Sequence, residues 1–313
     1  QKEILEGAGN QLQAFQDKGQ YWDAWNIDPN YQDYLLPASQ LKSIEYLDYG
    51  LIQSRIRVVR IIGNSDFIQD YIVQIYSPIL KIKTTVNWKE SHVLVKATFP
   101  LNLESNVVTS EISCGVIERL TCPETEAEKA KWEVYGHRWM DLTDINQNYG
   151  VSILNDCKYG FDCQPNKIRL TLLRGSKWPD EKADLGIHSF TYAIYPHTGN
   201  WKEAKTIQCG YELNIPLKAI IPVQSVDSCL PDNCSCLSLG TNSLILMALK
   251  QAENDENQWI LRCYESKGET VEIEFNGELN LKLSSSVNLL EENIDNNYLM
   301  IHPWKIVSYS IEK

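Results

Sequence analysis

Residues 54–62, SRIRVVRII, set a pattern that recurs along the chain. Ile56 and Val58 lie on one side of this stretch and two arginines lie on the other. A period of two is typical of a β-strand with one buried face. Residues 92–99, HVLVKATF, alternate in the same way, and the pattern continues in YIVQIY, ILKIKTTV, IRLTLL and HSFTYAIY. Because turn residues separate these short runs, the sequence predicts an all-β protein of antiparallel sheets.

The composition indicates a folded, acidic protein. Hydrophobic residues make up 43% of the 313 residues and charged residues 22%, which allows a packed core and room for two β domains. The net charge of −12, without a basic stripe, argues against nucleic acid or an anionic membrane as the main partner. No apolar run reaches the length of about 18 residues that a membrane span needs.

The cellular compartment is predicted from the cysteines and the N-terminus. Nine cysteines, an odd number, are spread unevenly along the chain. No signal-peptide pattern precedes them, so we expect free thiols in a reducing, cytoplasmic environment. The chain does not begin with methionine, and we expect it to be a piece of something longer.

The chain divides near residue 225, where prolines and a cysteine-rich polar stretch, IPVQSVDSCLPDNCSC, interrupt the strands. We expect a large antiparallel sandwich over residues 41–225 and a smaller one over residues 226–313. Residues 1–40 form a lead-in segment, and roughly the first 35 of them are predicted to be irregular or weakly helical. Residues 123–135, PETEAEKAKWEVY, read as a long surface loop with room for one helical turn.

No metal site is expected in this chain. The only cysteine cluster, Cys229, Cys234 and Cys236, has unsuitable spacing for zinc and no histidine near it. Loop thiols are the favoured interpretation, with a metal site or a disulfide as the alternatives. The five histidines are scattered and form no metal-binding motif.

The turn after GVSIL carries several side chains capable of chemistry. Asn155, Asp156, Lys158 and Tyr159 follow an apolar strand directly. Asp156 and Asp162 could form the pair of carboxyl groups that a glycosidase needs. The alternative, which we favour, is that Asp156 accepts backbone N–H bonds in the turn.

Arg174 shares the parity of Ile168, Leu170 and Leu172, so simple alternation directs it toward the apolar face. A buried guanidinium without a partner is costly. Either the strand ends at this point and the side chain reaches solvent, or it extends toward an anionic site or a neighbouring domain.

Trp22, Asp23 and Trp25 lie together in YWDAWNID. Aromatic faces can pack on sugar rings, so the two tryptophans could form a platform for carbohydrate. The alternative is that they anchor the segment that enters the first strand, which is the commoner role for such residues.

Several stretches, in the same order, resemble the C-terminal half of the glycoside hydrolase family 38 α-mannosidases, in their bacterial and cytosolic-type branch. They are GNQLQAFQDKGQYWDAWNID, VNWKESHVLVKATFP, EISCGVIERLT with KWEVYGHRWMDLTD, YGVSILNDCKYGFD, IRLTLLRGSKWPD, HSFTYAIYPHTGNW and ALKQAENDENQWILRCYE. The resemblance covers residues 9–265. It departs at Asn26, where the family form WDAWDID has aspartate, and at Cys229–Cys236, which lies in a variable linker.

The resemblance implies a retaining α-mannosidase with zinc or another divalent metal. In this family the metal ligands and both catalytic carboxylates lie in an N-terminal α/β barrel, and no βα alternation appears in this chain. Residues 1–40 would then lead in from the family's helical bundle, and residues 41–225 would form a galactose-mutarotase-like sandwich. The implied partners are the catalytic barrel and α-mannose-containing oligosaccharides.

No catalytic residue is therefore expected in this chain, which should be inactive alone. Arg174 is the best match to an arginine that, in the family, enters the active site from the sandwich. The turn residues at 155–159 and the tryptophan segment become candidates for the active-site wall or the domain interface. Without the barrel, Arg174 should face solvent or pair loosely with Asp180 or Asp184. The rival reading is a stand-alone carbohydrate-binding or scaffold module.

Overall fold

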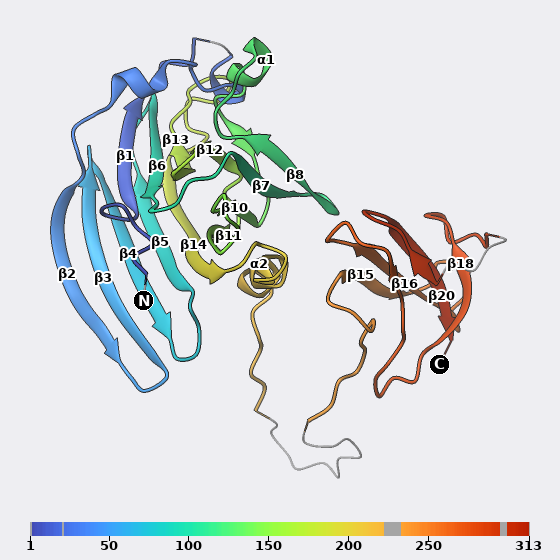
Figure 1. The fold of residues 1–313 in the computed structure, drawn as a ribbon. Helices are drawn as coiled ribbons and strands as arrows, with labels where there is room; N and C mark the ends of the chain where they lie inside the picture. Colours follow the sequence, from blue (N-terminus) through green and yellow to red (C-terminus); the bar gives the residue numbers. More distant parts are fainter. Residues whose placement is uncertain (1, 21, 222–232, 295–298, 313) are drawn as a thin grey trace. The chain divides into compact units, whose positions relative to one another are not determined.

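The computed structural model describes residues 2–20, 22–221, 233–294 and 299–312 (Figure 1). The chain forms two compact units: unit 1 comprises residues 1–111 and 117–217, and unit 2 comprises residues 112–116 and 218–313. Antiparallel strands dominate both units, which confirms the all-β prediction. The predicted boundary near residue 225 falls outside the described residues.

The larger sheet has nine strands, in the order β2-β3-β4-β5-β14-β11-β10-β7-β8. The strand pattern around residues 54–62 is confirmed, because β3 pairs along its whole length with β4. The strands are β2 (Gln40–Tyr49), β3 (Gln53–Ile62), β4 (Ser65–Gln74), β5 (Leu80–Trp88), β7 (Val107–Ile112), β8 (Gly115–Leu120), β10 (Trp139–Thr143), β11 (Tyr149–Asn155) and β14 (Gly186–Thr198).

The second sheet has five strands, in the order β1-β6-β13-β12-β9. They are β1 (Gln11–Gln16), β6 (Val93–Pro100), β9 (Val134–Tyr135), β12 (Gly160–Gln164) and β13 (Lys167–Arg174). Both sheets contribute to one hydrophobic core, in which Phe67 and Trp88 of the larger sheet join Phe99 and Leu170 of the smaller. The two sheets therefore pack face to face as a sandwich.

The first strand corrects the expectation for the opening residues. All six residues of β1 pair with β6, so this segment is neither irregular nor helical. Leu12 and Ala14 point into the core in the alternation typical of a strand. The stretch is short and rich in glutamine, which obscures that alternation in the sequence.

A β-bulge in β13 changes where Arg174 points. The pairing with β6 shifts between Thr171 and Leu173, so that Leu173 lies opposite Val95 and Arg174 lies opposite Leu94. One extra residue reverses the side-chain alternation beyond it. Arg174 therefore leaves the sheet on the face away from the main core, and the simple parity argument was wrong.

Unit 2 has its own small core. Its four-stranded sheet has the order β15-β16-β20-β18, with a separate two-stranded ladder. Leu261, Cys263 and Tyr309 are fully buried there. The strands are β15 (Leu244–Gln251), β16 (Trp259–Glu265), β18 (Lys282–Val287) and β20 (Ile306–Glu312), with β17 (Val271–Glu272) pairing with β19 (Met300–Ile301).

The described residues contain few helices. They are η1 (Asp23–Trp25), η2 (Tyr31–Tyr34), α1 (Glu126–Lys129) and α2 (Thr206–Asn214). The helical turn expected in the loop at 123–135 is α1, which starts with a capping box between Thr125 and Glu128. No helix among the described residues has the length and apolarity needed to cross a membrane.

Candidate functional site

Three tryptophans form a cup on the surface of unit 1. Trp22 directly precedes η1, Trp25 is its last residue, and Trp178 comes from the loop after β13. The ring centroid of Trp178 lies 6.2 Å from that of Trp22 and 5.2 Å from that of Trp25. With Asn26 the three rings line a hollow of about 490 Å³, which we call the tryptophan cup.

The rings of the tryptophan cup remain open to solvent. The exposed fractions are 73% for Trp22, 67% for Trp25 and 52% for Trp178. Large aromatic side chains normally bury most of their surface, so an exposed cluster of this kind marks an interaction site. No pattern in the sequence groups Trp178 with the other two tryptophans, because the contact joins segments more than 150 residues apart.

Asp23 links the segment that carries Trp22 and Trp25 to the loop that carries Trp178. Its buried Oδ2 accepts the backbone N–H groups of Lys177 at 2.7 Å and Trp178 at 2.9 Å. The Ala24 N–H donates in the other direction, to the Trp178 carbonyl at 3.3 Å. Gly19 has a φ of +69° and lies so close to the Asp23 carboxylate that a Cβ atom there would clash. Asp23 is thus the anchor, and the tryptophans are the exposed surface that it positions.

Trp22 adopts an unusual backbone conformation. Its φ of 60° and ψ of 48° lie in the left-handed region, which bulky residues rarely occupy. Such a conformation costs about 1–3 kcal/mol and persists where surrounding contacts enforce it, often at functional sites. Here the Trp22 carbonyl accepts the Trp25 N–H at 2.7 Å, which holds the tight turn.

Arg174 clamps the segment that carries the tryptophans. Its Nε donates to Asp17 Oδ2 and its Nη2 donates to the Asn26 carbonyl. The other oxygen of Asp17 accepts the Asp28 N–H at 3.0 Å. Asp28 in turn accepts the N–H groups of Lys18 and Gln20, at 3.0 and 2.8 Å. The loop between β1 and η2 is therefore held by a chain of buried carboxylates that ends at Arg174.

The expected partners of Arg174 were wrong. Asp180 accepts the Lys182 N–H at 2.9 Å, and Asp184 accepts the Ser176 hydroxyl at 3.1 Å. Both acids therefore stabilise their own loop. The side chain of Arg174 is 14% exposed and pairs instead with the buried Asp17, because the bulge in β13 turns it toward the segment after β1.

Asn155 and Asp156 support the backbone. Asn155 is fully buried, its Nδ2 donating to the His137 carbonyl and its Oδ1 accepting the Lys158 N–H, both at 2.7 Å. Asp156 Oδ2 accepts the N–H of Thr191 at 2.8 Å. Asp156 therefore accepts a backbone N–H group, as expected, but the donor belongs to β14, so the expectation that Asp156 caps its own turn was wrong.

Lys158 and Tyr159 lie at the edge of this turn. The Lys158 Nζ sits 4.3 Å from the centre of the Phe190 ring, and burial lowers the pKa of this lysine. Tyr159 is about half exposed and packs beside His137. The structure therefore separates the predicted residues into two groups, with Trp22, Asp23, Trp25 and Arg174 in one and the turn at 155–159 in the other.

The described residues do not fit a metal. No group of three or more histidine, cysteine, aspartate or glutamate side chains in that part of the chain could hold an ion. The eight cysteines there are free thiols, and Cys229 lies outside it. The proposed acid pair does not form either, because Asp162 binds Lys96 at 2.7 Å and Arg169 at 2.5 Å while Asp156 binds Thr191.

Two family descriptions match the chain. "Glycosyl hydrolases family 38 C-terminal domain" matches residues 1–182, and "Glycosyl hydrolases family 38 C-terminal beta sandwich domain" matches residues 243–309. The chain belongs to glycosyl hydrolase family 38. The first match contains the whole tryptophan cup and Arg174, and the second covers most of the four-stranded sheet of unit 2.

Curated relatives support this family 38 assignment. The chain is 34% identical to "Alpha-mannosidase 2C1" of Mus musculus over 304 residues, covering 95% of this chain and 29% of that protein. It is 34% identical to "Alpha-mannosidase G" of Dictyostelium discoideum over 277 residues, covering 87% of this chain and 25% of that protein. The chain therefore spans less than a third of the length of these relatives.

A solved family 38 structure shares the fold. A protein in the Glycosyl Hydrolase Family 38 from Enterococcus faecalis aligns with 96% of this chain and 40% of its own, with a TM-score of 0.79. The sequence identity is 15%, so this likeness supports the architecture and no particular residue role.

Proposed function

We propose that this chain is the non-catalytic C-terminal β region of a cytoplasmic, retaining α-mannosidase. In the full-length enzyme a catalytic barrel outside this chain would supply the divalent metal and both catalytic carboxylates. The observation that supports the proposal is that both matching domain descriptions are C-terminal domains of family 38. The curated relatives, by contrast, extend well beyond the matched region. The described residues offer no metal site that would point to catalysis by the chain itself.

We further propose that the tryptophan cup and Arg174 face the active site of the full-length enzyme. The cup offers three exposed indole rings, and aromatic faces pack well against the apolar faces of sugar rings. Asp23 and Arg174 hold this surface in one geometry before a ligand arrives, which reduces the entropy lost on binding. Arg174 is a positioning residue in this account, because it acts through Asp17 and the Asn26 carbonyl.

The isolated chain should not hydrolyse 4-nitrophenyl α-mannoside, with or without added zinc, whereas the full-length gene product should. The physical reason is that the acid and the nucleophilic carboxylate that hydrolysis needs are expected in the barrel outside this chain. Release of nitrophenol by each purified protein measures the difference. Turnover that co-purifies with the isolated chain through successive columns would refute the proposal. A gene without an upstream barrel would favour the rival carbohydrate-binding or scaffold module.

A further inference from the structure

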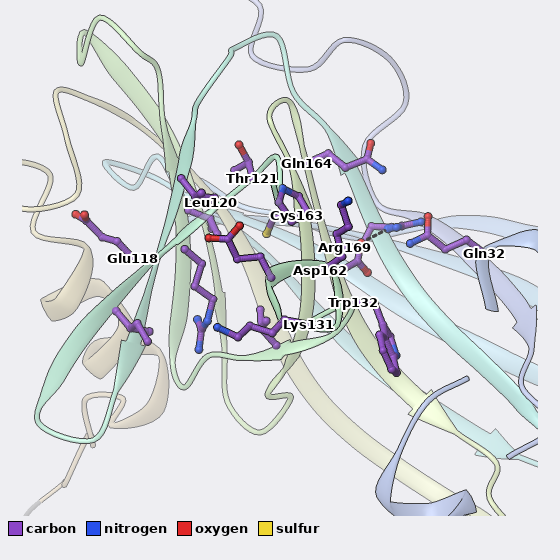
Figure 2. Close-up of a pocket in the computed structure, with 17 residues that line it drawn as sticks. Gln32, Glu118, Leu120, Thr121, Lys131, Trp132, Asp162, Cys163, Gln164 and Arg169 are labelled. Carbon is purple, nitrogen blue, oxygen red and sulfur yellow. Dashed lines mark hydrogen bonds and ion pairs between the residues drawn. The ribbon is translucent and has the colours of Figure 1, made fainter. Parts of the chain in front are cut away.

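A second hollow lies in unit 1, on residues outside the tryptophan cup. It encloses about 460 Å³ between β8, the loop that carries α1, and strand β12 (Figure 2). We call it the basic pocket. Gln32, Trp132 and Gln164 are among its lining residues. This volume lies within the range of about 300–1,000 Å³ that is usual for small-molecule sites.

The floor of the basic pocket is a buried ionic network. Asp162 accepts hydrogen bonds from Lys96 at 2.7 Å, Arg169 at 2.5 Å and the Tyr31 hydroxyl at 3.0 Å. Lys96 also pairs with Glu133. The network thus contains two cations, Lys96 and Arg169, and two carboxylates. Both oxygens of Asp162 already accept hydrogen bonds within it. Arg169 lines the pocket, and its buried Nη2 has no hydrogen-bond partner among the described residues.

The walls of the basic pocket carry two further cations, Arg119 and Lys131. Arg119 donates to the Ser110 hydroxyl at 2.7 Å and lies 4.9 Å from the centre of the Tyr135 ring. No ion pair involves Arg119 or Lys131 among the described residues. Burial lowers the pKa of Arg119, as expected for a guanidinium that has lost water without gaining a counter-ion.

The N–H groups of Thr125 and Glu124 and, less strongly, the charge of Lys131 lower the pKa of Glu128, so this acid offsets part of the charge of Lys131. Glu128 uses its carboxylate to accept the N–H groups of Glu124 and Thr125, both at 2.9 Å. Figure 2 shows Glu118 pointing away from the other lining side chains. Lys129, at the rim, is already paired with Glu126 at 2.9 Å. The lining of the pocket holds four cations and three acids, so it carries one more positive than negative charge in a chain whose net charge is −12.

We propose that the basic pocket binds a phosphorylated sugar. Arginine suits phosphate because its planar guanidinium offers several donors, and lysine adds a compact charge. A single phosphate would leave most of the hollow empty, whereas Gln32 and Gln164 can hydrogen-bond hydroxyl groups and Trp132 supplies apolar surface. The assignment is independent of the proposed mannosidase function, since it uses neither the tryptophan cup nor Arg174.

Calorimetric titration of the full-length protein with glucose 6-phosphate, inorganic phosphate and glucose tests this assignment. Glucose 6-phosphate should bind at least tenfold more tightly than phosphate, and glucose should not bind measurably. Lys131→Gln, at an exposed position, and Arg119→Gln should each weaken binding of glucose 6-phosphate at least tenfold. Lys42→Gln, at an exposed lysine of β2 that pairs with Asp66 at 2.7 Å and does not line the pocket, is the matched control and should leave binding of glucose 6-phosphate unchanged.

Other outcomes would overturn the assignment. Equal affinities for phosphate and glucose 6-phosphate would show an adventitious ion only. Binding that survives Lys131→Gln unchanged would place the ligand elsewhere, and this variant keeps the test decisive if Arg119→Gln fails to fold. The absence of any heat at millimolar ligand would contradict the assignment directly.

Discussion

Replacing Lys96 with methionine is expected to lower the free energy of unfolding by about 3–5 kcal/mol, the cost of breaking a buried ion pair from one side. Lys96 is fully buried and contacts two carboxylates, those of Glu133 and Asp162. Arg169 would still pair with Asp162, but Glu133 would keep only the Thr171 hydroxyl. Urea unfolding of wild type and variant at neutral pH measures the difference.

The loss of unfolding free energy caused by Lys96→Met should depend on pH. In the wild type, burial raises the pKa of Glu133 while Lys96 acts to lower it, so removing Lys96 should raise this pKa further and favour the protonated carboxyl group in the folded variant. A group whose folded pKa lies above its unfolded value contributes stability at low pH and loses it as pH rises. The difference between wild type and Lys96→Met should therefore be smaller at pH 5 than at pH 7.

Lys129→Met is the matched control for this prediction. Its ammonium pairs with Glu126 on the surface, and an exposed pair contributes about 0–1 kcal/mol. If Lys96→Met lowers the unfolding free energy no more than Lys129→Met does, the buried network adds nothing to stability.

Arg174→Ala is expected to affect both stability and activity. In the isolated chain, Asp17 would lose its cationic partner while buried, which should cost about 1.5–3 kcal/mol of unfolding free energy. In the full-length enzyme the tryptophan segment would loosen, and kcat/KM should fall at least tenfold, about 1.4 kcal/mol of transition-state stabilisation. Arg174→Lys keeps the charge without the planar guanidinium and should recover only part of each loss.

These two readouts separate the possible roles of Arg174. A variant that loses stability but keeps its kcat/KM in the full-length enzyme would make Arg174 purely structural. Normal stability of Arg174→Ala in the isolated chain would contradict the clamp with Asp17 and the Asn26 carbonyl. A solvent-facing Arg174, as expected from the sequence, would give only a small loss of stability, but the side chain is 14% exposed and paired with Asp17.

Alternation in the sequence was enough to predict the strands but not what covers each face. Lys96 and Thr98 alternate with Val95 and Ala97, which places them correctly on the outer face of the smaller sheet. That face should meet water, yet Lys96 is fully buried. Tyr31 and Glu133, from segments distant in sequence, lie over it, and no periodicity encodes such a contact.

The candidate site was predictable only in part. Trp22, Asp23 and Trp25 stand out in the sequence because tryptophans and an acid lie side by side. Trp178 does not, because its role depends on the backbone bonds from Asp23 that bring the two segments together. The prediction of where Arg174 points failed for another reason. One extra residue in the strand reverses the alternation of side chains, and nothing in the sequence IRLTLLR marks a bulge.

The full-length enzyme carrying Trp178→Ala tests the central claim most directly, namely that this β region supplies a sugar-contacting wall to the active site. The variant should raise KM for an α-mannose oligosaccharide at least tenfold. The effect on 4-nitrophenyl α-mannoside, which has no second sugar, should be much smaller. Trp259→Ala, at a partly exposed tryptophan of unit 2, is the matched control and should change neither value. Equal KM values for wild type and Trp178→Ala on the oligosaccharide would contradict the account.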